Sequence, residues 1–274
     1  SKVADAAIEK RIPTIKEFFN ESLATRILKN HGKVKIITAT NVFAHVKNLT
    51  SFVDGVKILL EDSGVFLTES HYLLDMVENL QYDEIYLEHL RYYSLTSLVN
   101  LFEHFGMDVF HAEHVETHGG SIRVFACKRG MRPIEDSVKL ILEEEEKYNL
   151  NSLETFKKFK IRVYKNWREL KELLISLKIN GGRIIGIGAP AKGNTLLNFC
   201  KLGPTILDYL VETNDWKIGK YSPGMHVKIL DESQLLKDQP EYARIMTGIR
   251  DNYYSDSEIK NWIQNGQIRE FKRF

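Results

Sequence analysis

One segment constrains the fold of this chain more than any other. Residues Arg183–Thr195 read RIIGIGAPAKGNT, in which a short apolar strand pattern passes through a glycine-containing turn into a helical pattern. The turn has the spacing Gly186-x-Gly188-x-x-Ala191, which matches the alanine form of the dinucleotide-binding fingerprint. Small residues let the backbone approach a phosphate, and the start of the helix adds N–H donors and partial positive charge. The segment therefore predicts a Rossmann-like α/β unit.

The sequence leaves two interpretations of this glycine turn open. In the first, Lys192 reaches an anionic ligand and Glu212, which ends the next strand, meets the ribose of NAD(P). Pro190 is unusual in such a turn, and Glu212 lies 26 residues after Gly186, where a spacing of about 20 is usual. In the second interpretation, the segment is a tight strand-to-helix connection that binds nothing.

A second α/β pattern precedes this unit. Val34–Thr40 (VKIITAT) is an apolar, β-branched run, typical of a buried parallel strand. A helix at Leu49–Leu60 and a strand at Gly64–Ser70 follow it, and this alternation predicts a doubly wound parallel sheet. Strands at Met107–Glu116 and Ser121–Lys128 follow closely on one another and predict a terminal antiparallel pair.

The two patterns divide the chain near residue 130. We expect one domain at 1–130 and a second at 131–274, which begins with a helical region, Ile134–Lys178, broken near Leu150–Ser152. The acidic run Glu143–Glu146 within this region is expected to be a solvated helix face, and a last helix is expected at Ser255–Asn265. Residues 72–93 are rich in Tyr, Glu and His without a clean period, which is typical of a functional loop.

Composition limits the kinds of partner. The chain has 274 residues and a net charge of +1, so no strong field favours nucleic acid. No apolar run approaches the roughly 18 residues of a membrane span, and the first residues lack a signal-peptide core. The two cysteines, Cys127 and Cys200, cannot form a structural zinc site alone. We therefore expect a soluble, cytoplasmic protein without a bound metal, and with neither nucleic acid nor membrane as a partner.

Four parts of the chain together resemble one family. In order they are Thr38–Val46 (TATNVFAHV), Gln81–Leu95 (QYDEIYLEHLRYYSL), Thr117–Val124 (THGGSIRV), and Gly186–Asn198 (GIGAPAKGNTLLN) with Trp216–His226 (WKIGKYSPGMH). They resemble the sugar C-methyltransferases, which use S-adenosylmethionine to methylate a ring carbon of a nucleotide-linked ketosugar. The resemblance covers almost the whole chain and thins after about residue 239. Each part alone is modest evidence, whereas four in the right order are specific.

The resemblance implies a catalytic pocket. It assigns His89 as the base that removes a proton next to the ketone, and it places Tyr86, Glu88 and His45 in the same pocket. The residue types suit this chemistry, because a histidine is a base at neutral pH and a tyrosine can donate to the developing oxyanion. Glu88 precedes His89 directly and is expected to orient one such imidazole or to tune its pKa. His45 follows a predicted parallel strand, where ligands of such folds bind.

The resemblance also implies binding residues. Contacts to the nucleotide-linked sugar are expected from four residues: His118, Gly188, Lys192 and Asn194. The adenine part of S-adenosylmethionine is expected near Phe18 and near Asn41. Gly119 and Gly120 beside His118 are expected to form a turn that needs positive φ or a close backbone approach.

The chain matches the family only in part. The family's methyltransferase domain opens with a strand, a glycine-rich turn and a second strand ending in an acidic residue, and this chain begins after that point. We therefore expect a partial class I methyltransferase (Rossmann-like) domain followed by a second Rossmann-like α/β domain. The chain is interpreted as a fragment, as one complemented by another chain, or as a degenerate relative. Absent inner strands expose a sheet edge, which predicts either a homo-oligomer through that edge or a rearrangement of strands in the first domain.

Two other functions are kept open. One is a nucleotide- or NAD(P)-binding module centred on Gly186–Ala191, in which the first domain serves for assembly. The other is an O- or N-methyltransferase, because such enzymes share the central fold.

Overall fold

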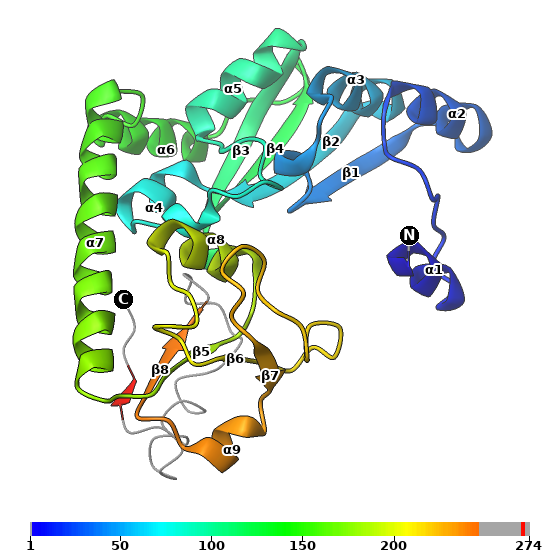
Figure 1. Ribbon diagram of the computed structural model, residues 1–274. Coiled ribbons are helices and arrows are strands. Elements are labelled where there is room, and N and C mark those ends of the chain that lie inside the picture. Colours follow the sequence, from blue (N-terminus) through cyan, green and yellow to red (C-terminus); the bar gives the residue numbers. More distant parts are fainter. Residues whose placement is uncertain (1, 247–269, 272–274) are drawn as a thin grey trace. The chain divides into compact units, whose positions relative to one another are not determined.

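The computed structural model describes residues 2–246 and 270–271 of the chain, which packs into two compact units (Figure 1). The first unit comprises residues 1–70, 90–114 and 122–145, and the second comprises 71–89, 115–121 and the residues from 146 onward. These two units are groups of residues that pack together, and each contains several separate segments of the chain. The boundary between two domains that the sequence places near residue 130 stays a prediction. The helix expected at Ser255–Asn265 lies outside the described residues.

The first unit is built around a four-stranded sheet in the order β1-β2-β4-β3. Its elements, some of which continue past the unit's limits, are α1 (Lys2–Glu9), α2 (Glu21–His31), β1 (Val34–Thr40), η1 (Phe43–His45), α3 (Leu49–Leu59), β2 (Leu60–His71), α5 (Leu95–His104), β3 (Met107–Val115), β4 (Ser121–Lys128) and α6 (Asp136–Lys147). Strands β1 and β2 are parallel, as predicted. Strands β3 and β4 are neighbours joined by only residues 116–120. A parallel pair needs a much longer crossover, so this pair is antiparallel.

The core of the first unit is a cluster of aromatic rings on one face of this sheet. The ring of Phe66 in β2 lies 6.2 Å from that of Phe52 in α3 and 5.9 Å from that of Phe102 in α5. Phe43 contacts all three rings. Helices α3 and α5 therefore cover the same face of the sheet, as Figure 1 shows.

Strand β1 differs from its prediction in burial. Within β1 only Ala39 is buried, and the side chain of Ile36 is 66% exposed. The reason is position, because β1 lies at the edge of the sheet and pairs only with β2 among the described strands. The β-branched pattern predicted a parallel strand correctly and a buried one wrongly. The exposed edge agrees with the expectation from the sequence, while an oligomer formed through it stays a prediction.

The second unit contains a five-stranded sheet in the order β7-β6-β5-β8-β9. Its elements are α4 (Leu73–Glu78), η2 (Tyr82–Glu84), η3 (Thr117–Gly119), α7 (Leu153–Ile179), β5 (Ile184–Ile187), α8 (Ala191–Cys200), β6 (Leu210–Glu212), β7 (Ile229–Asp231), α9 (Gln234–Asp238), β8 (Tyr242–Ile245) and β9 (Glu270–Phe271). All four neighbouring pairs are parallel. Numbered along the chain, the order is 3-2-1-4-5, the order of a Rossmann sheet. The predicted Rossmann-like α/β class is confirmed.

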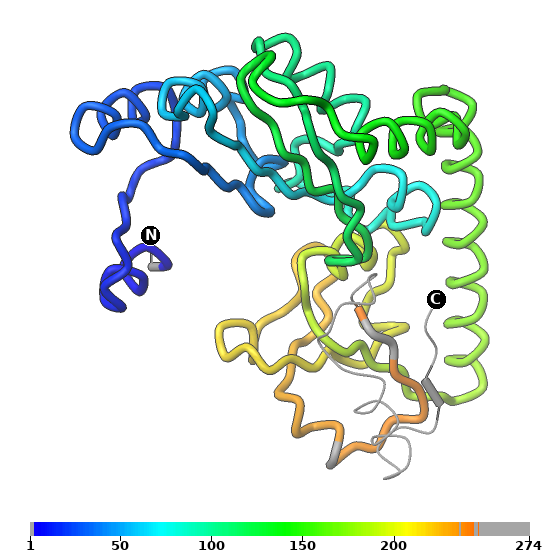
Figure 2. The backbone as a smooth tube through the Cα atoms, turned by 180° about the vertical axis from the view of Figure 1, so that it is seen from behind, coloured from blue at the N-terminus to red at the C-terminus, as the bar shows by residue number. Residues whose placement is uncertain are grey.

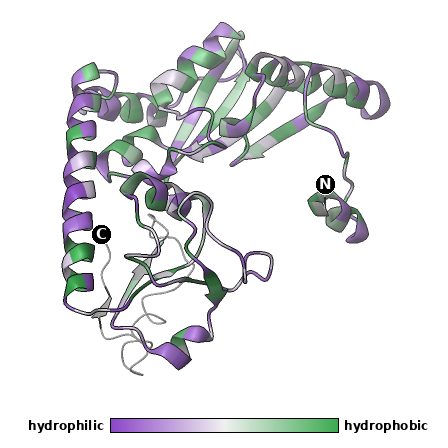
Figure 3. Cartoon of the chain, viewed as in Figure 1, coloured by the Kyte–Doolittle hydropathy of each residue, from purple (hydrophilic) through white to green (hydrophobic). Residues whose placement is uncertain are grey.

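The long helical region has the break that the sequence predicts. Helix α6 ends at Lys147 and α7 begins at Leu153, where the side chain of Ser152 accepts a hydrogen bond from the N–H of Glu154. Figure 2 shows α7 as one continuous helix. Its colouring in Figure 3 is mainly hydrophilic, because only one face packs on the core. Three residues at helical spacing form that face: Val163, Leu170 and Leu174.

The acidic run Glu143–Glu146 is not wholly solvated. Glu145 is fully buried in the first unit, and its carboxylate accepts hydrogen bonds from the backbone N–H groups of Leu95 and Thr96. The hydroxyl of Thr96 donates to it as well. A carboxylate at the start of a helix satisfies otherwise unpaired N–H groups and interacts favourably with the helix dipole. The expectation of a solvated face is wrong at Glu145, which caps α5.

Candidate active site

The segment after β2 brings several ionisable side chains together within the second unit. His71 ends β2, Glu84 ends η2, and His89 follows five residues later. Tyr82 fixes η2, because its ring is buried in the core of this unit and its hydroxyl donates to Oδ1 of Asn166 at 3.0 Å. The backbone that carries Glu84 is thereby fixed to helix α7.

Glu84 is the centre of this cluster. Its side chain is fully buried, and the ammonium of Lys192 in α8 lies 2.5 Å from Oε1. On Oε2, Nε2 of His71 is 3.3 Å away and Nδ1 of His89 is 3.9 Å away. The Lys192 ammonium is also 3.5 Å from Nε2 of His71. These four residues are called the His–Glu–Lys cluster below.

The ring of His89 has two different neighbours on its two nitrogens. Nδ1 lies 3.0 Å from the backbone carbonyl oxygen of Glu84, and Nε2 lies 3.2 Å from the hydroxyl of Tyr86. A carbonyl oxygen only accepts, so in the neutral ring Nδ1 carries the hydrogen and Nε2 the lone pair. The structure thus brings together His89 and Tyr86, two of the four residues expected in the catalytic pocket.

A carboxylate that the sequence did not single out lies beside His89. Glu88 is exposed, whereas Glu84 lies beside the ring through its side chain and its carbonyl group. The orienting role expected of Glu88, and its place in the pocket, stay predictions, and Glu84 is a second carboxylate in position to act on His89. His45 belongs to the first unit, and its role also stays a prediction.

Sequence reasoning missed His71 and Glu84. His71 had the same signal that drew attention to His45, namely a histidine at the end of a predicted parallel strand. Glu84 stood only two residues before Tyr86, in the same irregular segment. No local pattern revealed its burial, which depends on Lys192, 108 positions further along the chain.

The turn around His118 is tied to the same segment. The ring centroid of His118 lies 5.8 Å from that of His71. Gly120 has a φ of 121°, and a Cβ atom there would lie 2.2 Å from Cγ of Asp75. The carbonyl groups of the two glycines accept hydrogen bonds from the side chain of Gln81 and the N–H of Tyr72. The expected positive φ and close approach of this glycine pair are confirmed.

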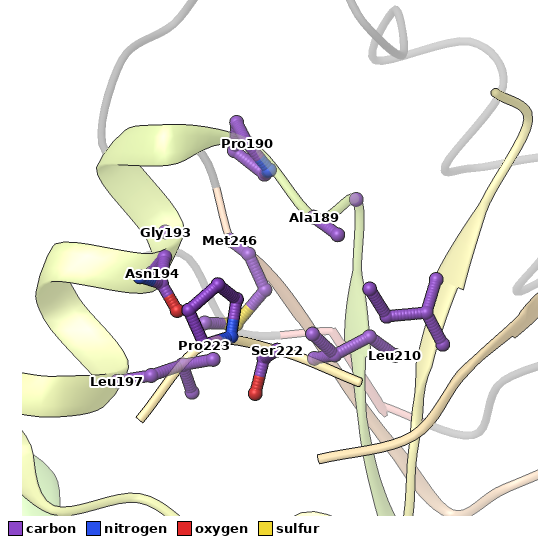
Figure 4. A pocket seen from close by; sticks show the side chains of 11 residues that line it. Ala189, Pro190, Gly193, Asn194, Leu197, Leu210, Ser222, Pro223 and Met246 are labelled. Carbon is purple, nitrogen blue, oxygen red and sulfur yellow. The ribbon is translucent and has the colours of Figure 1, made fainter. Parts of the chain in front are cut away.

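The remaining predicted substrate residues lie at the start of α8. Gly188 and Asn194 line a small pocket, whose walls include Leu210, Pro223 and Met246 (Figure 4). Lys192, from the same first turn of the helix, joins the His–Glu–Lys cluster instead. The N-terminus of α8 therefore contributes both to an apolar pocket and to an ionic cluster, and the substrate role of these residues stays a prediction.

Glu212 is already bound by groups of its own unit. Its buried carboxylate accepts hydrogen bonds from the N–H groups of Ala189 (3.1 Å), Thr213 (3.0 Å) and Asn214 (3.3 Å), and from the ammonium of Lys217 (3.1 Å). Burial alone would raise the pKa of Glu212, but Lys217 and the backbone donors outweigh it and lower the pKa. A carboxylate so occupied is poorly placed to bind a ribose, which weakens the NAD(P) interpretation.

Two residues of the first unit suit part of S-adenosylmethionine. Asn41 follows β1 with a φ of 53°, and its Oδ1 atom is buried without a hydrogen-bond partner among the described residues. A buried acceptor of this kind is costly unless a donor such as an adenine amino group satisfies it. Phe18 is 94% exposed and offers a ring face. These residues fit the adenine end of the cofactor and do not form a complete site alone.

The cluster could also be considered as a metal site. His71, Glu84 and His89 offer ligand atoms that all lie within 4.8 Å of one another. The positive charge beside Glu84 is, however, the ammonium of Lys192. The geometry is therefore that of an ion-pair network, and the absence of a metal stays an expectation.

Comparisons with known proteins agree with this fold. Residues 116–252 match the family model of the C-methyltransferase C-terminal domain, and residues 4–112 match that of a methyltransferase domain. The chain is therefore of the methyltransferase class, and more narrowly it belongs to the C-methyltransferase family. It is 30% identical over 265 residues to the C-methyltransferase NovU of Streptomyces niveus. That alignment covers 96% of this chain and 63% of NovU, so the chain spans less than two thirds of this relative.

The family predicted from the sequence is thus confirmed, as is the α/β class. Within residues 2–246, no helix combines the length and the apolarity needed to cross a membrane.

Proposed function

We propose that this chain carries the substrate-activating part of an S-adenosylmethionine-dependent C-methyltransferase. Its substrate is a nucleotide-linked ketosugar, methylated at the carbon next to the ketone. The observation that carries the proposal is the buried His89, whose Nε2 lone pair points to the hydroxyl of Tyr86 at 3.2 Å. Membership of the C-methyltransferase family supports it. When bound, S-adenosylmethionine supplies an electrophilic methyl group, and Asn41 and Phe18 hold its adenine end.

The chain's own residues act on the substrate. Nε2 of His89 removes a proton from the carbon beside the ketone, and the electron pair moves onto the carbonyl oxygen. Tyr86 turns its hydroxyl to that oxygen and stabilises the negative charge that develops there. A base and a donor that lie 3.2 Å apart can serve two positions separated by one carbon atom.

The nucleotide is assigned to the start of α8. The pocket lined by Gly188 and Asn194 offers an apolar wall and a side-chain amide, which suit a base and a sugar hydroxyl. Lys192 follows in the first turn of the same helix, and His118 lies near His71 of the cluster that Lys192 joins. This arrangement, together with the bound state of Glu212, favours a sugar nucleotide over NAD(P).

Calorimetry with a dTDP-linked sugar tests the binding step. We expect the Asn194→Ala variant to bind about tenfold more weakly, because one hydrogen bond of a neutral amide is lost. The matched control is Asn151→Ala, at an exposed asparagine outside the pocket. Binding of NAD(P) together with no binding of the sugar nucleotide would overturn the proposal.

The rate of methyl transfer tests the chemistry. Replacing His89 with Gln removes the base, and we expect the rate to fall by about 10² to 10⁴. His104→Gln, at an exposed histidine of α5, is the control and should keep the rate. A His89→Gln variant with an unchanged rate would exclude His89 as the base.

Two further proposals concern the whole protein. We place it in the cytoplasm, and we expect self-association through the edge strand β1, where Ile36 is exposed. Analytical ultracentrifugation of the Ile36→Lys variant tests the second point, because a charge on an edge strand opposes pairing. A sedimentation coefficient equal to that of a monomer in both proteins would contradict it.

A further inference from the structure

A fully buried carboxylate such as Glu84 calls for an explanation. An ionised carboxylate removed from water is costly unless cations and hydrogen bonds compensate it. Glu84 has the ammonium of Lys192 at 2.5 Å and Nε2 of His71 at 3.3 Å, on different oxygens. Buried ion pairs contribute little net stability compared with apolar side chains of the same size. Such a pair beside a buried histidine that has a polar neighbour on each ring nitrogen is therefore a candidate for a functional role.

The position of Glu84 relative to His89 indicates what that role is. Glu84 contacts the same ring nitrogen twice, through its carbonyl oxygen at 3.0 Å and through its carboxylate at 3.9 Å. The carbonyl oxygen fixes the hydrogen on Nδ1 and leaves Nε2 as the base. The carboxylate lies within the distance at which an opposite charge favours a protonated ring. We propose that Glu84 is the positioning residue that fixes the tautomer of His89 and stabilises its protonated form.

This inference deepens the proposed function and rests on it for its catalytic meaning. In the step concerned, the C–H bond beside the ketone breaks and an N–H bond forms at Nε2 of His89. The electron pair of the broken bond stays on the substrate as an enolate. The ring gains one positive charge, which lies beside the carboxylate of Glu84, and that carboxylate is also in contact with the ammonium of Lys192.

Other charged and titratable groups also face His89. Tyr86 contacts it from its own segment, and His71 approaches from the end of β2 with a ring-centroid distance of 4.9 Å. Lys192 reaches the cluster from α8, and His118 lies beyond His71 in the turn before β4. Lys192 opposes protonation of His89, so removing Glu84 has two effects of the same sign: it withdraws an anion and leaves a cation.

Nuclear magnetic resonance of the histidine rings in the full chain tests this directly. In the wild-type protein we expect the neutral His89 ring to carry its hydrogen on Nδ1, as read from the ¹⁵N shifts. In Glu84→Gln, the pH at which half of the His89 rings are protonated should fall by about one unit. Glu78→Gln removes the same charge from an exposed position on α4 and should leave that midpoint unchanged. The His89→Gln variant identifies the signal.

A second variant keeps the test valid if Glu84→Gln folds poorly. In Glu84→Gln/Lys192→Met both charges of the pair are removed, and the midpoint should still fall below that of wild type. A midpoint that stays within about 0.2 units of wild type in both variants would overturn the inference. A neutral ring with its hydrogen on Nε2 would do the same.

The outcome is separable from that of the proposed function, because these titrations need neither substrate nor cofactor. A shifted midpoint supports the role of Glu84 even if the methyl-transfer assay fails. The converse result is methyl transfer that depends on His89 together with a protonation midpoint of His89 that does not shift in the Glu84 variants. That result would overturn the role proposed for Glu84 and leave the proposed function standing.

Discussion

Glu84 and Glu212 are two buried glutamates of the second unit, and their surroundings differ. Glu212 accepts from three backbone N–H groups and from Lys217, all of which lie in the loops of its own sheet. Glu84 is contacted by side chains that can themselves gain or lose a proton, from β2, α8 and the irregular segment after η2. A carboxylate held by the backbone fixes a turn. A carboxylate in contact with titratable side chains influences whether those side chains are protonated, as a site of proton transfer requires.

The largest expected effect is on the free energy of unfolding, when the lysine that contacts each glutamate is replaced. Lys192→Met leaves a fully buried carboxylate without its cation and should lower the free energy of unfolding by about 3 kcal/mol. Lys217→Met leaves Glu212 with three backbone donors, so the loss should stay below about 1 kcal/mol. Urea unfolding at pH 8 measures the loss in each variant. If the two variants lose the same free energy of unfolding, Glu84 and Glu212 do not differ in how much they depend on their lysines.

The turn that Glu212 fixes is also closely packed, which gives the next largest effect. A Cβ atom on Gly186 would lie 2.4 Å from Cδ2 of Leu210 and 2.8 Å from Cγ of Met246. We expect Gly186→Ala to cost about 2 kcal/mol, because the interior must shift to admit it. Gly203→Ala is the control, since its nearest neighbour is the flexible end of Met225 at 3.1 Å. Thermal unfolding distinguishes the two, and an unchanged melting temperature for Gly186→Ala would show that the turn is looser than described.

The same comparison shows what the sequence could predict. The strand, glycine turn and helix from Arg183 to Thr195 were predicted correctly, because hydrophobic period and glycine spacing are local signals. The proximity of His89 and Tyr86 was expected from the family resemblance, which placed both in one pocket. The burial of individual strands was harder to predict from the sequence. Val34–Thr40 has the residue pattern of a central strand, but it lies at the edge of its sheet.

Long-range contacts explain the rest. Glu84 is buried by a lysine 108 positions away, and Glu145 caps a helix that begins 50 positions earlier. An acidic residue in a charged stretch has the same local pattern whether it is solvated or buried. Sequence patterns therefore predicted the secondary-structure elements better than the partners of individual charges.

Glu145 is another buried glutamate, and it belongs to the first unit. Its replacement should have a smaller effect on the free energy of unfolding. Its carboxylate accepts from the N–H of Leu95 at 2.5 Å and from the N–H of Thr96 at 2.9 Å. Glu145→Gln removes the charge from these hydrogen bonds, and we expect a loss of about 1 kcal/mol in the free energy of unfolding. The neighbouring Glu144 is exposed, and Glu144→Gln should stay within about 0.5 kcal/mol of wild type. Similar losses in both variants would mean that Glu145 acts only through the overall charge of α6.

The smallest effect concerns pH and tests the structural role assigned to Glu212. Because its pKa is lowered in the folded protein, the folded state holds this proton more weakly than the unfolded state does. The stabilisation is therefore complete above the ordinary glutamate value of about 4.3, and it is lost as the pH falls through the lowered pKa. The difference in urea midpoint between wild type and Glu212→Gln should be constant from pH 8 to about 5 and should narrow below about 4.

Glu172→Gln, at an exposed position on α7, should give no such narrowing. A difference that persists unchanged into acid would mean that Glu212 stabilises the turn through its shape alone, and not through the charge that its four donors hold. Glu212 would then differ from Glu84 only in that the partners of Glu84 in the His–Glu–Lys cluster can gain or lose a proton.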